Sequence, residues 1–355
     1  GIESSRYLAV DESRMLADPA RYYKGGKPDL QLFDKKLYEV NPDDKVAIAR
    51  AAAEEVLGKD ERIISVDSSY SDGEGSSYRL ISNGFEGESK STWFSVSASV
   101  SIKGEGEARP QDYWYDSALF YDKLTKTGIG AKALERVLRK LGQKKAKSGK
   151  YTMVVDPMNV GNLLSPMLSA LYGSALQQKN SFLMDKLDTK VASDLFTLRD
   201  EPHAIGANGS RYFDNEGVAT EPRTVFDKGV LKTYFIDTYN GKKMDIAPTI
   251  SAPSRLILTP GDKDLNGLVA DIKQGILVTG FNGGNSNSST GDFSYGIEGF
   301  LIEDGKLTQP VNEMNVTGNM VTLWNSLVAV GNDPQPNRSW QIPSLVFEGV
   351  DFSGL

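Results

Sequence analysis

The chain contains no cysteine, and its 355 residues include a single histidine, His203. Without cysteine it cannot form a disulfide, a thiolate metal site or a cysteine nucleophile. A catalytic zinc ion usually takes two or three imidazole ligands plus water, which one histidine cannot supply. A serine triad would need His203 as its base, and the sequence has no G-x-S-x-G element. A structural role is therefore favoured for His203, which follows Pro202 in a predicted turn.

Basic charge and long apolar runs are also scarce. The formal net charge is −7 and the isoelectric point about 5.1, a balance that disfavours binding to the nucleic-acid backbone. The longest uncharged stretch, residues 157–178, contains asparagines, a proline and several serines, so it is too polar to span a bilayer. We expect neither a nucleic acid nor a membrane as a partner. The lack of cysteine is consistent with a reducing compartment.

Local patterns in the first half predict a helix followed by strands. Asn41 and Pro42 form a helix start, because asparagine caps helices well and proline suits the first helical position. Asn83-Gly84 predicts a hairpin turn. From Phe94 to Ile102, apolar residues alternate strictly with serines. This period of two predicts a strand with one buried face and one hydroxyl-lined face.

The second half mixes β segments with short helical patterns. It predicts a buried strand at 151–156, a helix at 161–178 and another helix at 321–330. The basic stretch 139–150 is interpreted as a solvated helix end and an interdomain linker. The order of elements indicates an α+β fold with mixed, largely antiparallel sheets, scattered helices and at least two domains.

Two kinds of segment are candidates for chemistry. Asp214-x-Glu216 and Glu303-Asp304 could offer oxygen ligands to calcium or magnesium, although each lies in a predicted turn. The glycine- and serine-rich stretch 282–294 could line an anion or peptide site with backbone amides, and a mobile surface loop is the alternative. The residues of this stretch that we single out for a peptide cleft or an interface are Asn282, Gly283, Gly284, Thr290, Gly291, Asp292 and Ser294.

From about Tyr151 onward, an ordered series of segments resembles the C-terminal domain of the TldD/PmbA metallopeptidase family. The segments are Asn180–Leu183, Phe213–Thr220, Asp227–Tyr234, Thr290–Ser294, Gly299–Gly305, Pro310-Val311, Gly318-Asn319 and Val330–Asp333. Each one is weakly diagnostic, but their order and spacing together are specific.

The resemblance implies a division into domains. Residues 41–146 are similar to the middle domain of the family, and residues 147–355 to its C-terminal domain. Residues 1–40 would be a linker, or the tail of an N-terminal domain that is largely missing from this chain. Such a domain would have roughly a hundred residues.

The resemblance also locates a lost metal site. The active branch of the family carries H-E-x-x-x-H on a helix before the segment that matches Ser181, and those positions correspond to Leu164, Ser165 and Ser169 here. The active branch uses a late cysteine as well, and this chain has none. The departure is typical of the PmbA (TldE) branch. It implies no catalytic residue and no metal in this chain, with Leu164 filling the space that a ligand would occupy.

The family implies a function and a partner. The expected function is that of a non-catalytic subunit of a cytoplasmic heterodimeric peptidase that cleaves unfolded or small peptides. A TldD-type subunit would supply the zinc. The sequence leaves undecided whether the isolated chain forms a homodimer. The alternatives are an autonomous hydrolase with an oxygen-ligated metal, dependent on Asp292 or Glu216, and a non-enzymatic regulator of a topoisomerase or a toxin system. The family name "modulator of DNA gyrase" is treated as a genetic label.

Overall fold

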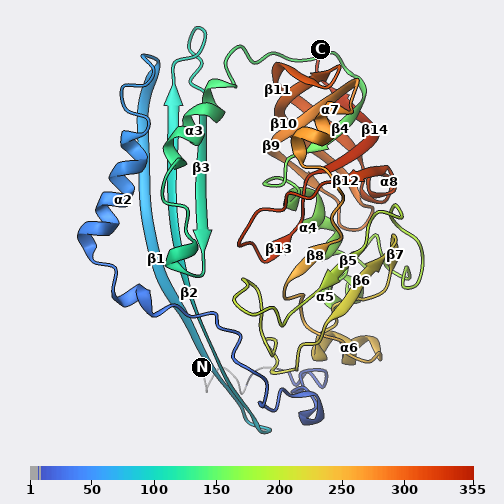
Figure 1. Cartoon of the computed structure of the whole chain (residues 1–355). Coiled ribbons are helices and arrows are strands. Elements are labelled where there is room, and N and C mark those ends of the chain that lie inside the picture. The colour runs from blue at the N-terminus through green and yellow to red at the C-terminus, as the bar shows by residue number, and fades with distance from the viewer. Residues whose placement is uncertain (1–6, 8) are drawn as a thin grey trace.

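The computed structural model describes residue 7 and residues 9–355. An elongated three-stranded sheet stands beside a larger C-terminal body that contains two further sheets (Figure 1). Helices are few and short, and most strand pairs are antiparallel. This arrangement confirms the predicted α+β class with scattered helices.

The central sheet consists of long antiparallel strands. They are β1 (Ile63–Ile81), β2 (Phe85–Ile102) and β3 (Gln111–Ala118). The turn between β1 and β2 is the predicted hairpin, with Gly84 at a φ of 108°. Helix α2 (Pro42–Glu54) begins where predicted, because the side chain of Asn41 accepts a hydrogen bond from the backbone N–H of Asp44.

The two faces of the central sheet differ as the alternation predicts. Phe94, Val96, Ala98, Val100 and Ile102 are buried in a cluster with α2 and with α3 (Ile129–Leu138). The serines of β2 therefore lie on the opposite face. That face looks toward the C-terminal body, because the guanidinium of Arg338 lies 5.0 Å from the ring centroid of Tyr115 on β3.

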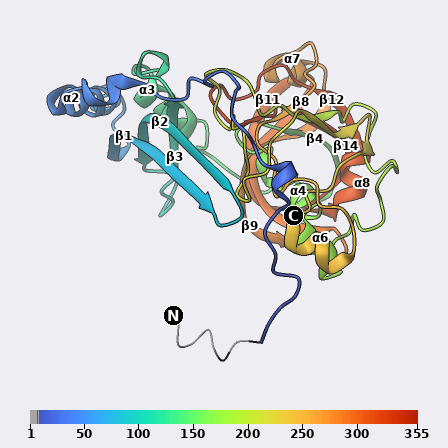
Figure 2. The same cartoon turned by 90° about the horizontal axis from the view of Figure 1, so that it is seen from below.

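The C-terminal body contains a closed sheet. The strands in order are β11 (Lys306–Asn319), β10 (Asp292–Glu303), β9 (Gln274–Ser286), β4 (Gly149–Val155) and β14 (Leu345–Ser353). Because β11 also pairs with β14, these strands form a ring, and Figure 2 shows it from below. Strand β12 (Leu327–Val330) pairs with residues 345–347 of β14, and β11 pairs with residues 351–353. Only the β4–β9 pair within this sheet is parallel.

A smaller third sheet and several short helices complete the body. The sheet runs β13 (Trp340–Gln341), β8 (Leu256–Leu258), β5 (Leu198–Asp200), β6 (Arg223–Asp227) and β7 (Val230–Leu231). The helices are α4 (Gly161–Ser169), α5 (Gly173–Gln177), α6 (Thr238–Met244), α7 (Leu265–Ala270) and α8 (Met320–Asn325). Single 3-10 turns occur at Pro19–Arg21, Lys35–Tyr38 and Tyr121–Lys123.

The main core joins the closed sheet to α4 and α8. Met153 and Val155 of β4 point into it, while the intervening Val154 packs outward against α7. Leu163, Leu164, Met167 and Leu168 of α4 belong to the same core as Trp324 of α8. Helix α4 therefore closes one side of the ring with hydrocarbon.

The N-terminal segment is attached to the C-terminal body. Tyr22 is buried and forms an antiparallel bridge with Val218. Its hydroxyl also donates to the Oδ1 of Asn83 at the tip of the β1–β2 hairpin, at 2.6 Å. Residues 17–31 thus connect the hairpin tip to the C-terminal body. Within the described part of the chain, none of the helices is long and apolar enough to cross a bilayer.

Two predicted helices are shorter than expected. The helix predicted at 321–330 ends at Asn325, because Leu327–Val330 pairs with β14 as β12. The single helix predicted at 161–178 is in fact α4 and α5, separated by residues 170–172. Tyr172 leaves the helical conformation with a ψ of 141°.

Candidate functional site

Helix α4 carries the positions that correspond to the zinc-binding helix. Leu164 is fully buried at 0% exposure and Leu168 is 2% exposed, which confirms the prediction that they turn inward. Ser165 and Ser169 lie on the exposed side of the helix. The helix therefore presents hydrocarbon to the core and two short hydroxyl side chains to the outside.

The helix ends soon after Pro166 for a non-local reason. Pro166 lies in the interior of α4 rather than in its first turn, and the helix stops at Ser169. The backbone N–H of Phe235 donates to the carbonyl of Leu171 at 2.9 Å, and the N–H of Gly173 donates to the carbonyl of Phe235 at 2.8 Å. This pairing draws residues 170–172 out of the helix. A proline that cannot donate the usual backbone bond makes the break easier.

The residues singled out in the stretch 282–294 fall in two places. Asn282, Gly283 and Gly284 belong to β9 and are exposed, and only residues 287–291 form a true loop. Gly284 has a φ of 94°, and a Cβ there would lie 2.1 Å from the carbonyl oxygen of Ser294. Glycine is thus required for the close pairing of β9 with β10.

The tip of this hairpin is tied down. Thr290 and Asp292 are exposed and hydrogen-bonded to each other at 2.8 Å, whereas Gly291 is buried against Phe182. The side chain of Asn319 donates to the Asp292 carboxylate at 3.0 Å, and the bonds from Asn319 and Thr290 lower the pKa of that carboxyl. This part of the stretch is an ordered turn.

The candidate carboxylates Asp214 and Glu216 accept hydrogen bonds from the backbone. Asp214 accepts hydrogen bonds from the backbone N–H groups of Glu216, Val218 and Ser251. Glu216 accepts from the N–H and the hydroxyl of Thr238, and burial raises the pKa of its carboxyl. In the described residues there is no group of three or more histidine or acidic side chains placed to hold a metal ion.

His203 lies apart from α4 in its contacts. A ring nitrogen lies 3.1 Å from the hydroxyl oxygen of Thr220, and the ring centroid lies 5.0 Å from that of Tyr212. Burial, followed by the nearby charge of Lys27, lowers the pKa of the imidazole. These contacts fit a structural role.

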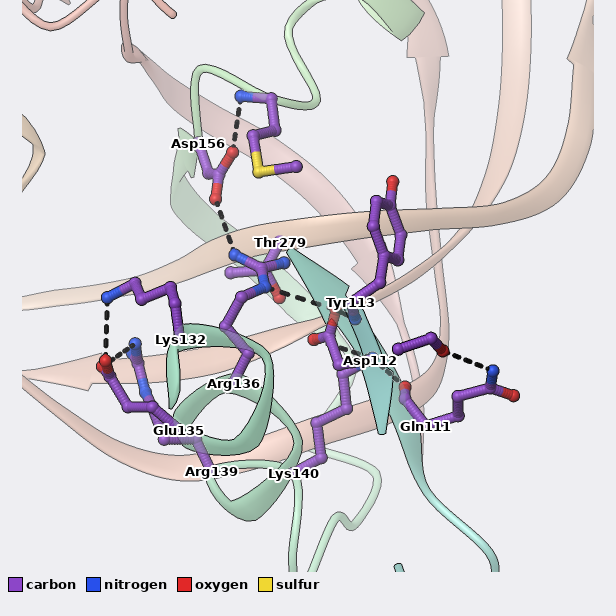
Figure 3. A network of polar contacts seen from close by, with 12 residues as sticks. Gln111, Asp112, Tyr113, Lys132, Glu135, Arg136, Arg139, Lys140, Asp156 and Thr279 are labelled. Atoms are coloured by element: carbon purple, nitrogen blue, oxygen red, sulfur yellow. Dashed lines mark hydrogen bonds and ion pairs between the residues drawn. The ribbon is translucent and has the colours of Figure 1, made fainter. Parts of the chain in front are cut away.

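A buried ion cluster joins the central sheet to the C-terminal body (Figure 3). The ammonium of Lys140 lies 2.8 Å from the carboxylate of Glu298 on β10 and 3.2 Å from that of Asp112 on β3. Arg136 of α3 contacts Asp112 at 3.3 Å and Asp156 at 3.8 Å. The cluster contains two cations and three carboxylates. Burial raises the pKa of Asp156, while Arg136 opposes that shift.

Sequence reasoning missed this cluster. Lys140 lies in the basic stretch interpreted as solvated, yet it is only 9% exposed. Its partner Glu298 is distant in sequence, so no local pattern announces the pair. The one local signal is Arg136. This charged residue precedes Val137, which lies on the buried apolar stripe of α3.

Three neighbouring hollows share lining residues, and two of them lie between the central sheet and the C-terminal body. The first, of about 340 Å³, lies beside the ion cluster and is lined by Tyr113, Asn159, Phe281 and Asn282 among others. A second, of about 170 Å³, shares Met158 with the first and reaches Gly161 at the start of α4. A third, of about 330 Å³, shares Ser339 with the second and is lined by Ser91 and Arg211. We call these three hollows the interdomain groove.

The positions that correspond to the zinc ligands of the active branch do not supply zinc ligands here. Zinc sites are built from histidine, cysteine and carboxylate side chains. The α4 positions supply a buried leucine and two serines instead, and the sequence holds one histidine and no cysteine. The residues present therefore do not fit a catalytic zinc ion. The two hollows between the central sheet and the C-terminal body offer largely polar linings.

Comparison with known proteins points to one family. Residues 148–354 match the family model of the PmbA/TldA metallopeptidase C-terminal domain, and residues 35–141 match that of the central domain. The "Metalloprotease PmbA homolog" of Haemophilus influenzae is 29% identical over 358 residues, covering 99% of this chain and 78% of the relative.

Solved structures agree. A Bacteroides thetaiotaomicron protein, named as a candidate modulator of DNA gyrase, is 73% identical and superposes with a TM-score of 0.99 over 100% of this chain and 81% of its own. TldE from Thermococcus kodakarensis has a TM-score of 0.80 at 22% identity, covering 99% of this chain and 82% of its own, and so supports the fold. This chain therefore spans about four fifths of the length of these relatives.

Proposed function

The chain belongs to the PmbA/TldE branch of the PmbA/TldD metallopeptidase family, and from this premise we propose that it is a non-catalytic subunit of a two-chain peptidase. A TldD-type chain would be the partner and would carry the zinc, the activated water and the general base. The assembly would act in the cytoplasm on unfolded or small peptides. This chain would supply one wall of the chamber in which they are cleaved.

One observation carries the proposal. The helix that bears the metal ligands in the active branch corresponds to α4, whose Leu164 is fully buried in the core. A leucine in that place fills the volume of a ligand and can donate no electron pair to a metal. Refilling a core position with hydrocarbon preserves stability, because cavities are costly. The chain thereby retains the fold of the family without the metal ligands on this helix.

The interdomain groove supports the role of a wall. Two of its three hollows are lined from both the central sheet and the C-terminal body, largely by polar residues. A narrow groove between two layers accepts an extended chain and rejects a folded domain. This selectivity fits a peptidase for unfolded substrates.

Reconstitution tests the proposal. The purified chain would be mixed with its TldD-type partner, and the mass of the product measured by light scattering together with cleavage of an unfolded peptide. We expect a complex that cleaves peptide, while this chain alone does not. Absence of a complex would count against the proposal, and cleavage by this chain alone would favour an autonomous hydrolase.

A triple variant tests whether the site is dismantled. Leu164→His, Ser165→Glu and Ser169→His together restore the H-E-x-x-x-H pattern on α4. We expect no peptidase activity after zinc loading, because a further ligand and the groups that orient the imidazoles are also missing. Circular dichroism must first show that the variant folds, since a histidine at position 164 enters the core. Robust cleavage by the folded variant would show a dormant site and overturn the expectation.

A further inference from the structure

One face of the central sheet is lined almost entirely with hydroxyl groups. We define the hydroxyl face as the odd-numbered positions of β1, β2 and β3 on this side of the sheet, along the stretch that the three strands share. Rows of register partners cross it, such as Ser69, Ser97 and Tyr115. Along the stretch shared by the three strands, the serines of this face are Ser65, Ser69, Ser71, Ser95, Ser97, Ser99, Ser101 and Ser117. Such a run is unusual, because strands favour β-branched and aromatic residues.

These hydroxyl groups retain hydrogen-bond donor and acceptor positions that a ligand could use. The Oγ atoms of Ser69 and Ser97 lie 2.9 Å apart, and the side-chain amide of Gln111 donates to the Oγ of Ser99 at 2.8 Å. A serine hydroxyl offers one donor and two acceptor positions, so one contact leaves the others free. The face is also open, since Ser69 is exposed and Tyr113 is 51% exposed.

The few charged side chains on the hydroxyl face limit the chemical classes of ligand that it could bind. From Ser65 to Ser77, from Gly87 to Ser101 and from Gln111 to Ser117, the only charged side chain on this side of the sheet is Asp67. From the C-terminal body, the guanidinium of Arg338 lies over Tyr115 of this face. A nucleic acid or a strongly charged peptide needs an extended field of opposite sign, which two isolated charges of opposite sign do not provide. Its ligand must therefore be uncharged and rich in hydrogen-bonding groups.

The spacing of the hydroxyls matches an extended peptide. Successive side chains on one face of a strand are about 6.7 Å apart. An extended chain repeats its own amide groups at the same interval, so a peptide laid along the strands meets a serine at each dipeptide. The aromatic pair Tyr113 and Tyr115, whose ring centroids are 6.1 Å apart, adds flat apolar surface for side chains of any sequence.

The geometry points to a substrate-holding surface, and we propose that the hydroxyl face beside β3 binds an extended, uncharged peptide segment through its main chain. The inference rests on the proposed function, because it gives the chamber wall a role in holding substrate. Binding through the main chain is independent of sequence, which suits a peptidase for unfolded chains.

A pair of double variants tests the inference. In Ser69→Ala with Ser97→Ala, two hydroxyls that bond each other are removed together, so neither is left unsatisfied. The matched control is Ser77→Ala with Ser89→Ala, an identical hydroxyl pair at 2.9 Å on the same side of the sheet but beyond the end of β3. Binding of a fluorescent peptide of alternating threonine and glutamine would be followed by anisotropy. An eight-residue peptide equals β3 in length.

We expect the first variant to bind the peptide at least about fivefold more weakly than the unsubstituted chain, the loss of about one net hydrogen bond. The control should bind within twofold of it, and Tyr113→Ala should weaken binding by a similar factor to the first variant. Equal binding by all variants, or binding of a neutral oligosaccharide in place of the peptide, would overturn the inference.

Assembly with the TldD-type partner separates the two proposals. The Ser69→Ala, Ser97→Ala variant should still form the complex. If the complex forms and peptide binding is unchanged, the hydroxyl face has no such role while the proposed function stands. If peptide binding weakens as expected but no complex forms with any variant, the proposed function alone fails.

Discussion

The two walls of the interdomain groove are built on opposite principles. The C-terminal wall includes a closed sheet whose interior packs against α4 and α8, with inward positions such as Met153, Val155 and Phe347 occupied by hydrocarbon. The central sheet is a single layer covered on one face by α2 and α3, with the other face left to serines and tyrosines. A closed, filled structure can keep its fold without a metal site, whereas an open polar face leaves its side chains accessible.

The largest expected effect tests the filled wall. Leu164→Ala should lower the free energy of unfolding by about 3 kcal/mol, because it removes buried methyl groups and leaves a cavity. The matched control is Ser165→Ala on the exposed side of the same helix, which should change stability by less than about 0.5 kcal/mol. Chemical denaturation of the two variants measures both. Similar values would mean that α4 does not fill the core.

The ion cluster that joins the two walls, which we call the seam, should give the next largest effect on stability. Lys140→Met removes the ammonium that two carboxylates share, so the buried Asp112 and the partly buried Glu298 lose a counter-charge. We expect a loss of about 2 kcal/mol. Lys145→Met provides the control, because the pair of Lys145 with Glu313 is exposed and contributes little. If the two variants unfold at the same denaturant concentration, the cluster does not hold the walls together.

A smaller effect is expected in the pH dependence of the seam. Burial raises the pKa of Asp156, so the folded state holds this proton to a higher pH than the unfolded state. Its contribution to stability is complete below the unfolded pKa and is lost as the pH rises through the folded pKa. The unsubstituted chain should therefore lose melting temperature relative to Asp156→Asn as the pH is raised above about 4.

Asp60→Asn is a control of opposite sign. Hydrogen bonds from Arg62 lower the pKa of Asp60 to about 2, so its stabilising contribution is present above the unfolded pKa and lost as the pH falls toward 2. The unsubstituted chain should lose melting temperature relative to this variant on acidification. Parallel pH profiles for Asp156→Asn and the unsubstituted chain would contradict a buried carboxylate at the seam.

The smallest expected effect concerns the open wall. Ser97→Ala should change the stability of the central sheet by less than about 0.5 kcal/mol, since its face is solvated. Its neighbour Val96, only 1% exposed, points to the opposite face, and Val96→Ala should cost about 2 kcal/mol. Thermal unfolding of both variants sharpens the contrast between faces. A large loss in Ser97→Ala would mean that the serine face is packed rather than open.

Sequence alone predicted the features that local chemistry controls. The cap at Asn41 and the hairpin at Gly84 depend on neighbouring residues, and the alternation in β2 sets both faces of the sheet. The resemblance to the family located α4, and the cost of an empty core position predicted that Leu164 and Leu168 turn inward.

What was missed depends on contacts between distant residues. Residues 170–172 leave the helix to pair with Phe235, and residues 327–330 join β14 instead of extending α8. Lys140 is buried only because Glu298 lies opposite it. A local pattern contains no information about such partners. The groove itself was not predicted, because it arises from the placement of one sheet against another.

The zinc content of the reconstituted complex tests the central claim most directly. The account predicts that this chain alone binds no stoichiometric zinc, and that its complex with a TldD-type partner contains one zinc ion for each pair of chains and cleaves unfolded peptide. Zinc bound stoichiometrically by this chain alone, with peptide cleavage in the absence of the partner, would contradict it.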